Sequence, residues 1–145
     1  MKPLDWTADP QIGYSVVRRG DGGMHFTFTD VSHETLVHWR EFALRHLAGA
    51  EGMNRNLYDL RQVRELPDEA IRLAVEANSD PAARSVRIAL LVADEGMVSR
   101  LQEIAALSLG ADMRLFSDPE LAEAWLSRPF SPVLRHALHA SPPAD

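Results

Sequence analysis

The sequence predicts an α/β fold with a mixed sheet of four to five strands, opened by an antiparallel hairpin. Two short runs with strand character flank the glycine-rich residues 20–23, which is typical of a hairpin turn. Further strand-like runs then alternate with helical patterns, which favours parallel pairing through crossover helices. The most apolar run, residues 86–93, is typical of a central strand that is covered on both faces.

Residues 14–19 and 24–29 are the strands of the predicted hairpin. Both are rich in Tyr, Val, Phe and Thr, and Met24, Phe26 and Phe28 alternate with polar residues. That period of two predicts a strand with one buried face. The Gly and Asp residues between the runs supply the positive φ angles that a tight hairpin needs.

A helix is predicted after the hairpin. Residues 30–32 offer helix-capping side chains, and Gly49 is a typical C-terminal stop. Between them, apolar residues recur three or four positions apart: Leu36, Trp39, Ala43 and Leu47. The pattern predicts one helix with a buried stripe.

A strand, a polar loop and a second helix come next. Residues 56–60 have the character of a short buried strand. Pro67 suits the first turn of a helix, and Asp68 and Glu69 complement the dipole at its N-terminus. The Asp-Pro pair at 80–81 is expected to end this helix.

The remaining elements repeat the strand-and-helix order. Residues 98–108 show helical apolar spacing after the central strand, and residues 113–116 have strand character. Asp118 and Pro119 then provide the cap and the first position of a final helix. A doubly wound, flavodoxin-like fold is the alternative, but such a fold would begin with a crossover helix instead of a hairpin.

We expect a single domain over residues 14–128 of the 145-residue chain. Residues 1–13 are predicted to be a flexible lead, and residues 129–145 a Pro-rich tail with a short amphipathic segment. The sequence contains neither the apolar segment of a signal peptide nor an apolar run of about 20 residues. These features predict a cytoplasmic protein without integral membrane association.

The composition excludes several classes of function. The chain has no cysteine, which excludes disulfides, thiolate metal sites and cysteine nucleophiles. Its net charge of −6, without a basic block, argues against nucleic acid and anionic membranes as partners. The one lysine, Lys2, lies in the predicted lead, so a P-loop lysine and a pyridoxal-phosphate lysine are absent from the domain.

Three local patterns resemble the SpoIIAA-like superfamily, which includes STAS domains and SEC14-type lipid-binding domains. They are Leu-Tyr-Asp-Leu-Arg at 57–61, the apolar run at 87–94, and Arg-Leu-Phe-Ser-Asp at 114–118 followed by Glu-Ala-Trp-Leu at 123–126. Over residues 14–126 the chain is similar to stand-alone bacterial proteins with STAS or SEC14-like domains. The resemblance implies helices wound around the sheet as a β-α superhelix.

In the anti-sigma-factor antagonists of that superfamily, a serine after the third strand is phosphorylated and controls docking to a kinase. The family pattern begins with Asp-Leu, which Asp59 and Leu60 match. Neither serine nor threonine occurs between Thr35 and Ser79, so the phosphorylation switch is not carried over to this chain.

Polar residues at the ends of two predicted strands are the candidate ligand or partner loop. Asp59 either caps its loop or pairs with Arg61, or it acts chemically at the carboxyl end of its strand. Arg61 and Arg64, next to a helix N-terminus, either bind an anion or neutralise the acids that follow them. Asp94 is either an acid or base, or the cap of the next helix.

Apolar side chains form a second group of candidates. Trp39 and Phe42 are core residues, the lining of a lipid pocket, or an exposed interface for a partner or a second copy. The tail segment is also a candidate interface, which packs on the edge of its own domain or on a second copy through Val133, Leu134 and Leu138. The histidines are scattered without the spacing of metal ligands, and neither a metal nor a cofactor is predicted.

These observations predict a non-enzymatic regulatory or protein-interaction module of STAS-like fold that forms homodimers. The alternative is a carrier or sensor of a small apolar or amphipathic ligand held between the sheet and the helices. An enzyme built on Asp59, Asp94 and the arginine loop ranks lower, and a role at a lipid surface ranks last because the chain is acidic.

Overall fold

The structure is a computed structural model of the 145-residue chain, and it confirms the predicted α/β class with a five-stranded mixed sheet and four helices in the described residues. It describes residues 6, 9–48, 54–79, 86–107 and 112–129. The strands are β1 (Tyr14–Arg18), β2 (Met24–Phe28), β3 (Asn54–Asp59), β4 (Val86–Leu91) and β5 (Asp112–Phe116). The helices are α1 (His33–Ala48), α2 (Asp68–Asn78), α3 (Glu95–Leu107) and α4 (Pro119–Leu126).

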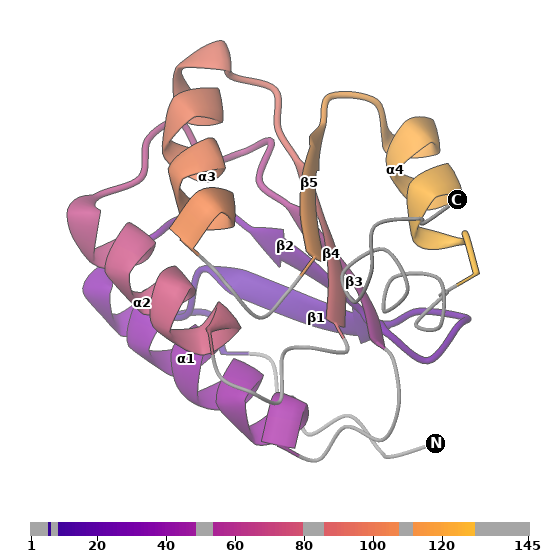
Figure 1. The fold of residues 1–145 in the computed structure, drawn as a ribbon. Helices are drawn as coiled ribbons and strands as arrows, with labels where there is room; N and C mark the ends of the chain where they lie inside the picture. Colours follow the sequence, from indigo (N-terminus) through magenta and orange to yellow (C-terminus); the bar gives the residue numbers. More distant parts are fainter. Residues whose placement is uncertain (1–5, 7–8, 49–53, 80–85, 108–111, 130–145) are drawn as a thin grey trace, which may run out of the picture.

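The strands lie in the sheet in the order of the sequence, β1-β2-β3-β4-β5 (Figure 1). The β1–β2 pair is antiparallel and every later pair is parallel, as the hairpin and the crossover helices predict. The turn closes with a hydrogen bond from the Arg19 N–H to the Gly23 carbonyl, at 2.8 Å. Gly22, with φ of 93°, supplies the left-handed residue that this turn requires.

The sequential strand order places the three connecting helices on one face of the sheet. Each parallel crossover advances by one strand in the same direction, so crossovers of one hand must all pass over the same face. Accordingly, α1 packs on α2 and α2 packs on α3 (Figure 1). The strand order does not reverse, so the described sheet lacks the switch point at which doubly wound folds bind nucleotides.

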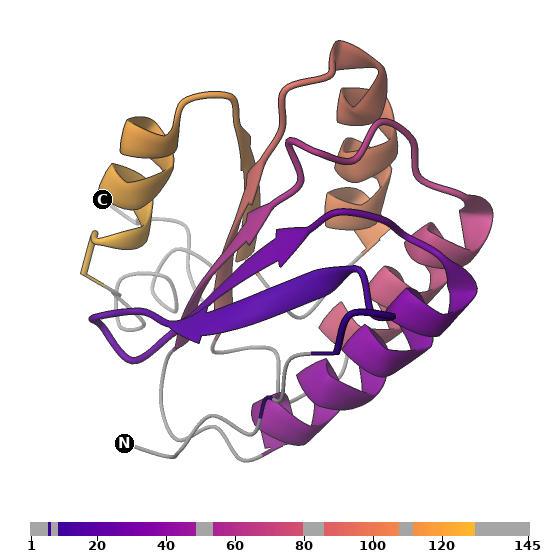
Figure 2. The same ribbon diagram turned by 180° about the vertical axis from the view of Figure 1, so that it is seen from behind.

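Helix α4 covers the opposite face of the sheet, as Figure 2 shows from behind. Alternate residues of β3 and β4 face the two layers. Tyr58 and Ile88 belong to the core under α1–α3, whereas Leu57 and Ala89 pack against Trp125 of α4. The domain therefore has a large core on one side and a smaller one on the other.

Part of the predicted flexible lead packs on the domain. The Trp6 ring lies 4.6 Å from the Tyr14 ring, centroid to centroid, and Ile12 also contacts the larger core. The Gly13 N–H donates to the buried Thr35 hydroxyl at 2.9 Å. An indole ring and a buried backbone hydrogen bond from the described part of the lead therefore contact β1 and α1.

The helix starts follow their predicted signals with one shift. Asp118 caps α4 by accepting a hydrogen bond from the Glu120 N–H at 2.9 Å, and Pro119 is the first helical residue. Pro67 lies one position earlier than predicted, as the extended N-cap of α2. The predicted stop at Gly49 and the break at 80–81 lie outside the described residues.

Candidate functional site

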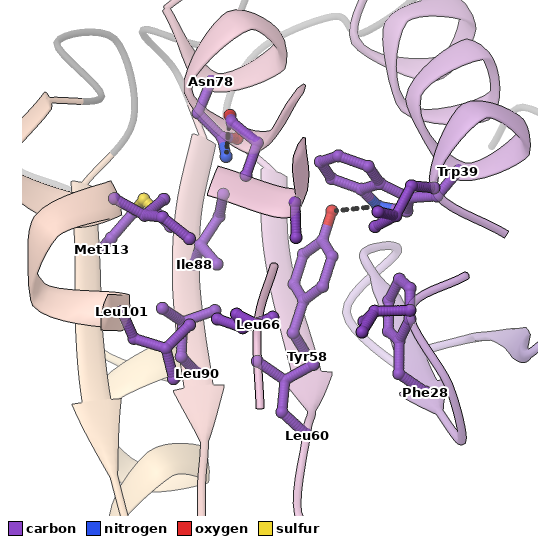
Figure 3. Close-up of a pocket in the computed structure, with 15 residues that line it drawn as sticks. Phe28, Trp39, Tyr58, Leu60, Leu66, Asn78, Ile88, Leu90, Leu101 and Met113 are labelled. Atoms are coloured by element: carbon purple, nitrogen blue, oxygen red, sulfur yellow. Dashed lines mark hydrogen bonds between the residues drawn. The ribbon is translucent and has the colours of Figure 1, made fainter. Parts of the chain in front are cut away.

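The larger core contains a half-open pocket with a volume of about 60 Å³ between the sheet and helices α1–α3 (Figure 3). It begins beneath α2, which directs two small side chains, Ala70 and Ala74, toward it at a spacing of one helical turn. The neighbouring helices present large apolar residues instead. The lining consists of Phe28, Val31, Leu36, Trp39, Tyr58, Leu60, Leu66, Ala70, Ala74, Asn78, Ile88, Leu90, Leu101, Ile104 and Met113.

Tyr58 brings a hydroxyl group into this apolar lining. Its position on β3 places the ring on the helix-covered face, stacked on Phe26 at a centroid distance of 4.3 Å. The hydroxyl accepts a hydrogen bond from the Trp39 indole Nε1 at 3.2 Å, drawn as a dashed line in Figure 3. Burial raises the pKa of Tyr58 far above its usual value, so the hydroxyl keeps its proton.

Asn78 is the other polar side chain that lines the cavity. It is 5% exposed, and its Nδ2 donates to the Ala74 carbonyl at 2.9 Å. Because a carbonyl can only accept, this bond fixes which end of the amide is the nitrogen. Among the described residues, the Asn78 Oδ1 atom has no hydrogen-bond donor.

The chemistry of the cavity follows from these groups. Among the described residues that line it, none carries a formal charge at neutral pH. A cavity of 150 Å³ lined by Leu, Ile and Phe alone stays dry and binds benzene, whereas this lining adds a hydroxyl and an amide. At about 60 Å³ this cavity suits a molecule of only a few non-hydrogen atoms.

The predicted ligand or partner loop lies elsewhere, at the carboxyl end of β3. Asp59 and Arg61 form a two-point ion pair, with Arg61 Nε 3.0 Å from Oδ1 and Nη2 2.8 Å from Oδ2. The Arg61 N–H also donates to Asp59 at 3.1 Å. The hydrogen bonds from Arg61 lower the pKa of Asp59, so the residue is a carboxylate. Of the alternatives given above, Asp59 therefore has the one in which it caps its loop and pairs with Arg61.

Arg61 and Arg64 share a surface pocket with Asp94 and Glu95. Asp94 accepts from the Gly96 N–H at 2.8 Å, and its carbonyl accepts from the Met97 N–H, so it caps α3. The pocket therefore contains two carboxylates beside Arg64 and an Arg61 that is already paired with Asp59, a balance of charge that disfavours an anionic ligand.

One prediction from the sequence was that Arg61 and Arg64 pair with the acids at the start of α2. The structure shows other partners for these acids. Asp68 instead accepts from Arg100 of α3 at 2.8 Å. Glu69 lies 2.6 Å from the His33 ring and 3.7 Å from Arg72. Arg100 also donates to the Leu66 carbonyl at 2.8 Å, so it holds the loop before α2 against α3.

The candidate interface residues of α1 are core residues in the structure. Trp39 is 4% exposed and Phe42 is 3% exposed, so neither side chain presents a surface to a partner of the folded chain. Both side chains lie on the face of α1 that packs on the sheet, where they contact the aromatic rings of Phe26 and Phe28. Val133, Leu134 and Leu138 lie outside the described residues.

Sequence reasoning did not assign a functional role to Tyr58 or Asn78. A signal was present, because Asn78 continues the inward face of α2 four residues after Ala74 and eight after Ala70. The strand position of Tyr58 predicts burial, but not which neighbour the hydroxyl meets.

Comparisons with known proteins add no assignment: no protein-family model, curated protein or solved structure matches this chain. Within the described residues, no helix is long and apolar enough to cross a membrane. The same part of the chain contains no cluster of three or more His, Asp or Glu side chains that could hold a metal ion.

Proposed function

We propose that this chain is a non-catalytic carrier or sensor that binds a small apolar ligand between the sheet and helices α1–α3. The observation that carries the proposal is the apolar cavity beneath the small side chains of α2. Native cores are packed to the density of organic crystals, whereas a half-open space remains beneath Ala70 and Ala74. A ligand there would add packing contacts.

Two features favour binding over catalysis. The acids considered for acid–base chemistry are engaged structurally, with Asp59 paired to Arg61 and Asp94 capping α3. The cavity itself offers a tyrosine held in its protonated form and an amide, neither of which is a base. These groups can orient a ligand but cannot abstract a proton from it.

The resemblance to the SpoIIAA-like superfamily belongs to the same proposal. Sequential strands with α1–α3 on one face support a β-α superhelix of that kind. The ligand-binding interpretation also parallels the SEC14-type branch in placing a ligand within the fold, although this cavity is far smaller than a lipid.

The test is a methyl-resolved NMR titration with xenon and butane under pressure. The tightest small ligands gain about 1.5 kcal/mol per non-hydrogen atom, which limits butane to a Kd of roughly tens of micromolar. Millimolar probe should therefore shift the methyl signals of Ile88 and Leu101, which line the cavity, whereas benzene should not. Unchanged methyl signals with both xenon and butane would refute the proposed function.

A cavity-filling variant makes the test specific. Ala70→Leu places three additional carbon atoms in the cavity and should abolish butane binding. Ala106→Leu makes the same change at an exposed position of α3 and should leave binding intact. Equal binding by both variants would show that butane binds elsewhere.

A protein-interaction module is the second candidate, and the observation that favours it is the edge strand β1. One side of β1 has no neighbouring strand in the described sheet. The strand also carries Val17, whose side chain is 59% exposed. Exposed apolar edge strands pair readily with a second copy. Light scattering at increasing concentration should show a dimer that Val17→Lys disrupts, and a monomer at all concentrations would exclude pairing of β1 with a second copy.

A further inference from the structure

We propose that the ligand of the cavity is a small, neutral molecule that carries a hydroxyl group on an apolar body. This inference rests on the proposed function and specifies the chemical class that the site accepts. It follows from the two buried polar side chains, Tyr58 and Asn78, and from the absence of charge around them among the described lining residues.

Neutrality follows from the lining. A carboxylate or an ammonium group transferred from water into this cavity would meet no counter-charge among the described residues that surround it. The cost of burying such a charge without a partner exceeds what a molecule of this size gains by apolar contact. Fatty acids, amines and phosphates are therefore excluded as ligands.

Tyr58 requires an acceptor. A phenolic hydroxyl donates one hydrogen bond and accepts others, and the Trp39 indole uses an acceptor position at 3.2 Å. Among the described residues, no acceptor meets the proton of this hydroxyl. Because Tyr58 is 8% exposed, an oxygen atom of a bound molecule is the partner that the site lacks.

Asn78 requires a donor. Its Nδ2 is engaged by the Ala74 carbonyl, which leaves Oδ1 as the free end of a side chain that is 5% exposed. A ligand that meets both side chains must therefore both accept and donate. A hydroxyl group is the smallest neutral group that does both, whereas an ether or a ketone only accepts and an amine is charged.

The experiment compares probes with an equal number of non-hydrogen atoms: butane, 1-propanol, methoxyethane, propylammonium and acetate. Affinities for the wild-type chain are measured by the same methyl-resolved titration. We expect 1-propanol to bind more tightly than its isomer methoxyethane, by about threefold or more, because the ether cannot donate to Asn78. Propylammonium and acetate should not bind, and binding of either as tight as 1-propanol would overturn the inference.

Variants then separate the two polar contacts. Tyr58→Phe should weaken 1-propanol binding about tenfold and leave butane within about twofold, since the ring is retained and the donor is lost. Asn78→Leu should remove the advantage of 1-propanol over methoxyethane. Tyr14→Phe is the matched control, because Tyr14 is a buried tyrosine bonded to His38 that does not line the cavity.

The outcomes distinguish this inference from the proposed function. If butane binds and Tyr58→Phe leaves the 1-propanol to butane ratio unchanged, the hydroxyl class is wrong although the cavity still binds ligands. If neither butane nor 1-propanol binds the wild-type chain, both the proposed function and this inference are refuted. If Tyr14→Phe lowers 1-propanol affinity as much as Tyr58→Phe, the effect is structural and the assignment to Tyr58 is refuted.

Discussion

Replacing Asn78 by leucine should stabilise the fold, although it removes a buried hydrogen bond. The bond from Nδ2 to the Ala74 carbonyl is worth about 1 kcal/mol, and that carbonyl lies within α2, where the helix supplies its usual backbone donor. The Oδ1 atom has no protein donor among the described residues but a water molecule can reach it, so its removal recovers only about 1 kcal/mol of desolvation cost. The additional apolar surface of leucine contributes about 1 kcal/mol. The sum favours Asn78→Leu by about 1 kcal/mol.

Urea and thermal unfolding measure this difference. In a chain of this length, about 1 kcal/mol corresponds to a rise in Tm of roughly 2–4 °C. Asn56→Leu is the matched control, because Asn56 is 2% exposed and its Oδ1 accepts from the Met24 N–H at 3.0 Å. That variant leaves a backbone donor unpaired and should be about 1–3 kcal/mol less stable than the wild-type chain. If Asn78→Leu lowers the Tm instead, the claim that its amide oxygen is unsatisfied is refuted.

Three further predictions address the surroundings of the core. Asp59→Asn should cost about 1 kcal/mol or less, measured by urea unfolding. Because Arg61 lowers the pKa of Asp59 in the folded chain, the wild-type advantage should be constant above about pH 5 and disappear as the pH falls through that lowered value. Gly23→Ala should lower the stability by about 2 kcal/mol or more in thermal unfolding, because a β-carbon there would overlap the Arg55 carbonyl of β3; an unchanged Tm would contradict this. Asp118→Ala should cost about 0.5–2 kcal/mol and speed amide exchange in α4 more than in α3, whereas uniform exchange would argue against a capping role.

The fold was predictable because its signals are local. The alternation of Met24, Phe26 and Phe28 with polar residues predicts a half-buried strand, and the glycines before it predict the hairpin turn. The Asp118-Pro119 cap is likewise encoded in adjacent residues. Strand order is less local, yet crossovers of one hand limit it to few arrangements, of which the sequential one is realised here.

The site was harder to predict because it depends on which side chains meet across the core. The loop with Arg61 and Arg64 was a candidate ligand site because its charges cluster in the sequence. In the structure, Arg61 forms an ion pair with Asp59, two residues away. Such a short-range pair can be inferred from the sequence. The contact between Trp39 and Tyr58 joins α1 to β3 and depends on the packing of both elements, which no spacing rule reveals.

The topology explains why a binding site of this chain should lie inside the fold. Doubly wound sheets bind ligands in the crevice where the strand order reverses, and this sheet does not reverse. Its helices α1–α3 instead form an unbroken layer, so space arises where that layer carries small side chains. Ala70, Ala74 and Asn78 lie on successive turns of the middle helix, α2, directly above β3 and β4. If Asn78→Leu stabilises the chain as expected, Asn78 is a local departure from the most stable sequence, which is the kind of position at which the proposed ligand site is sought.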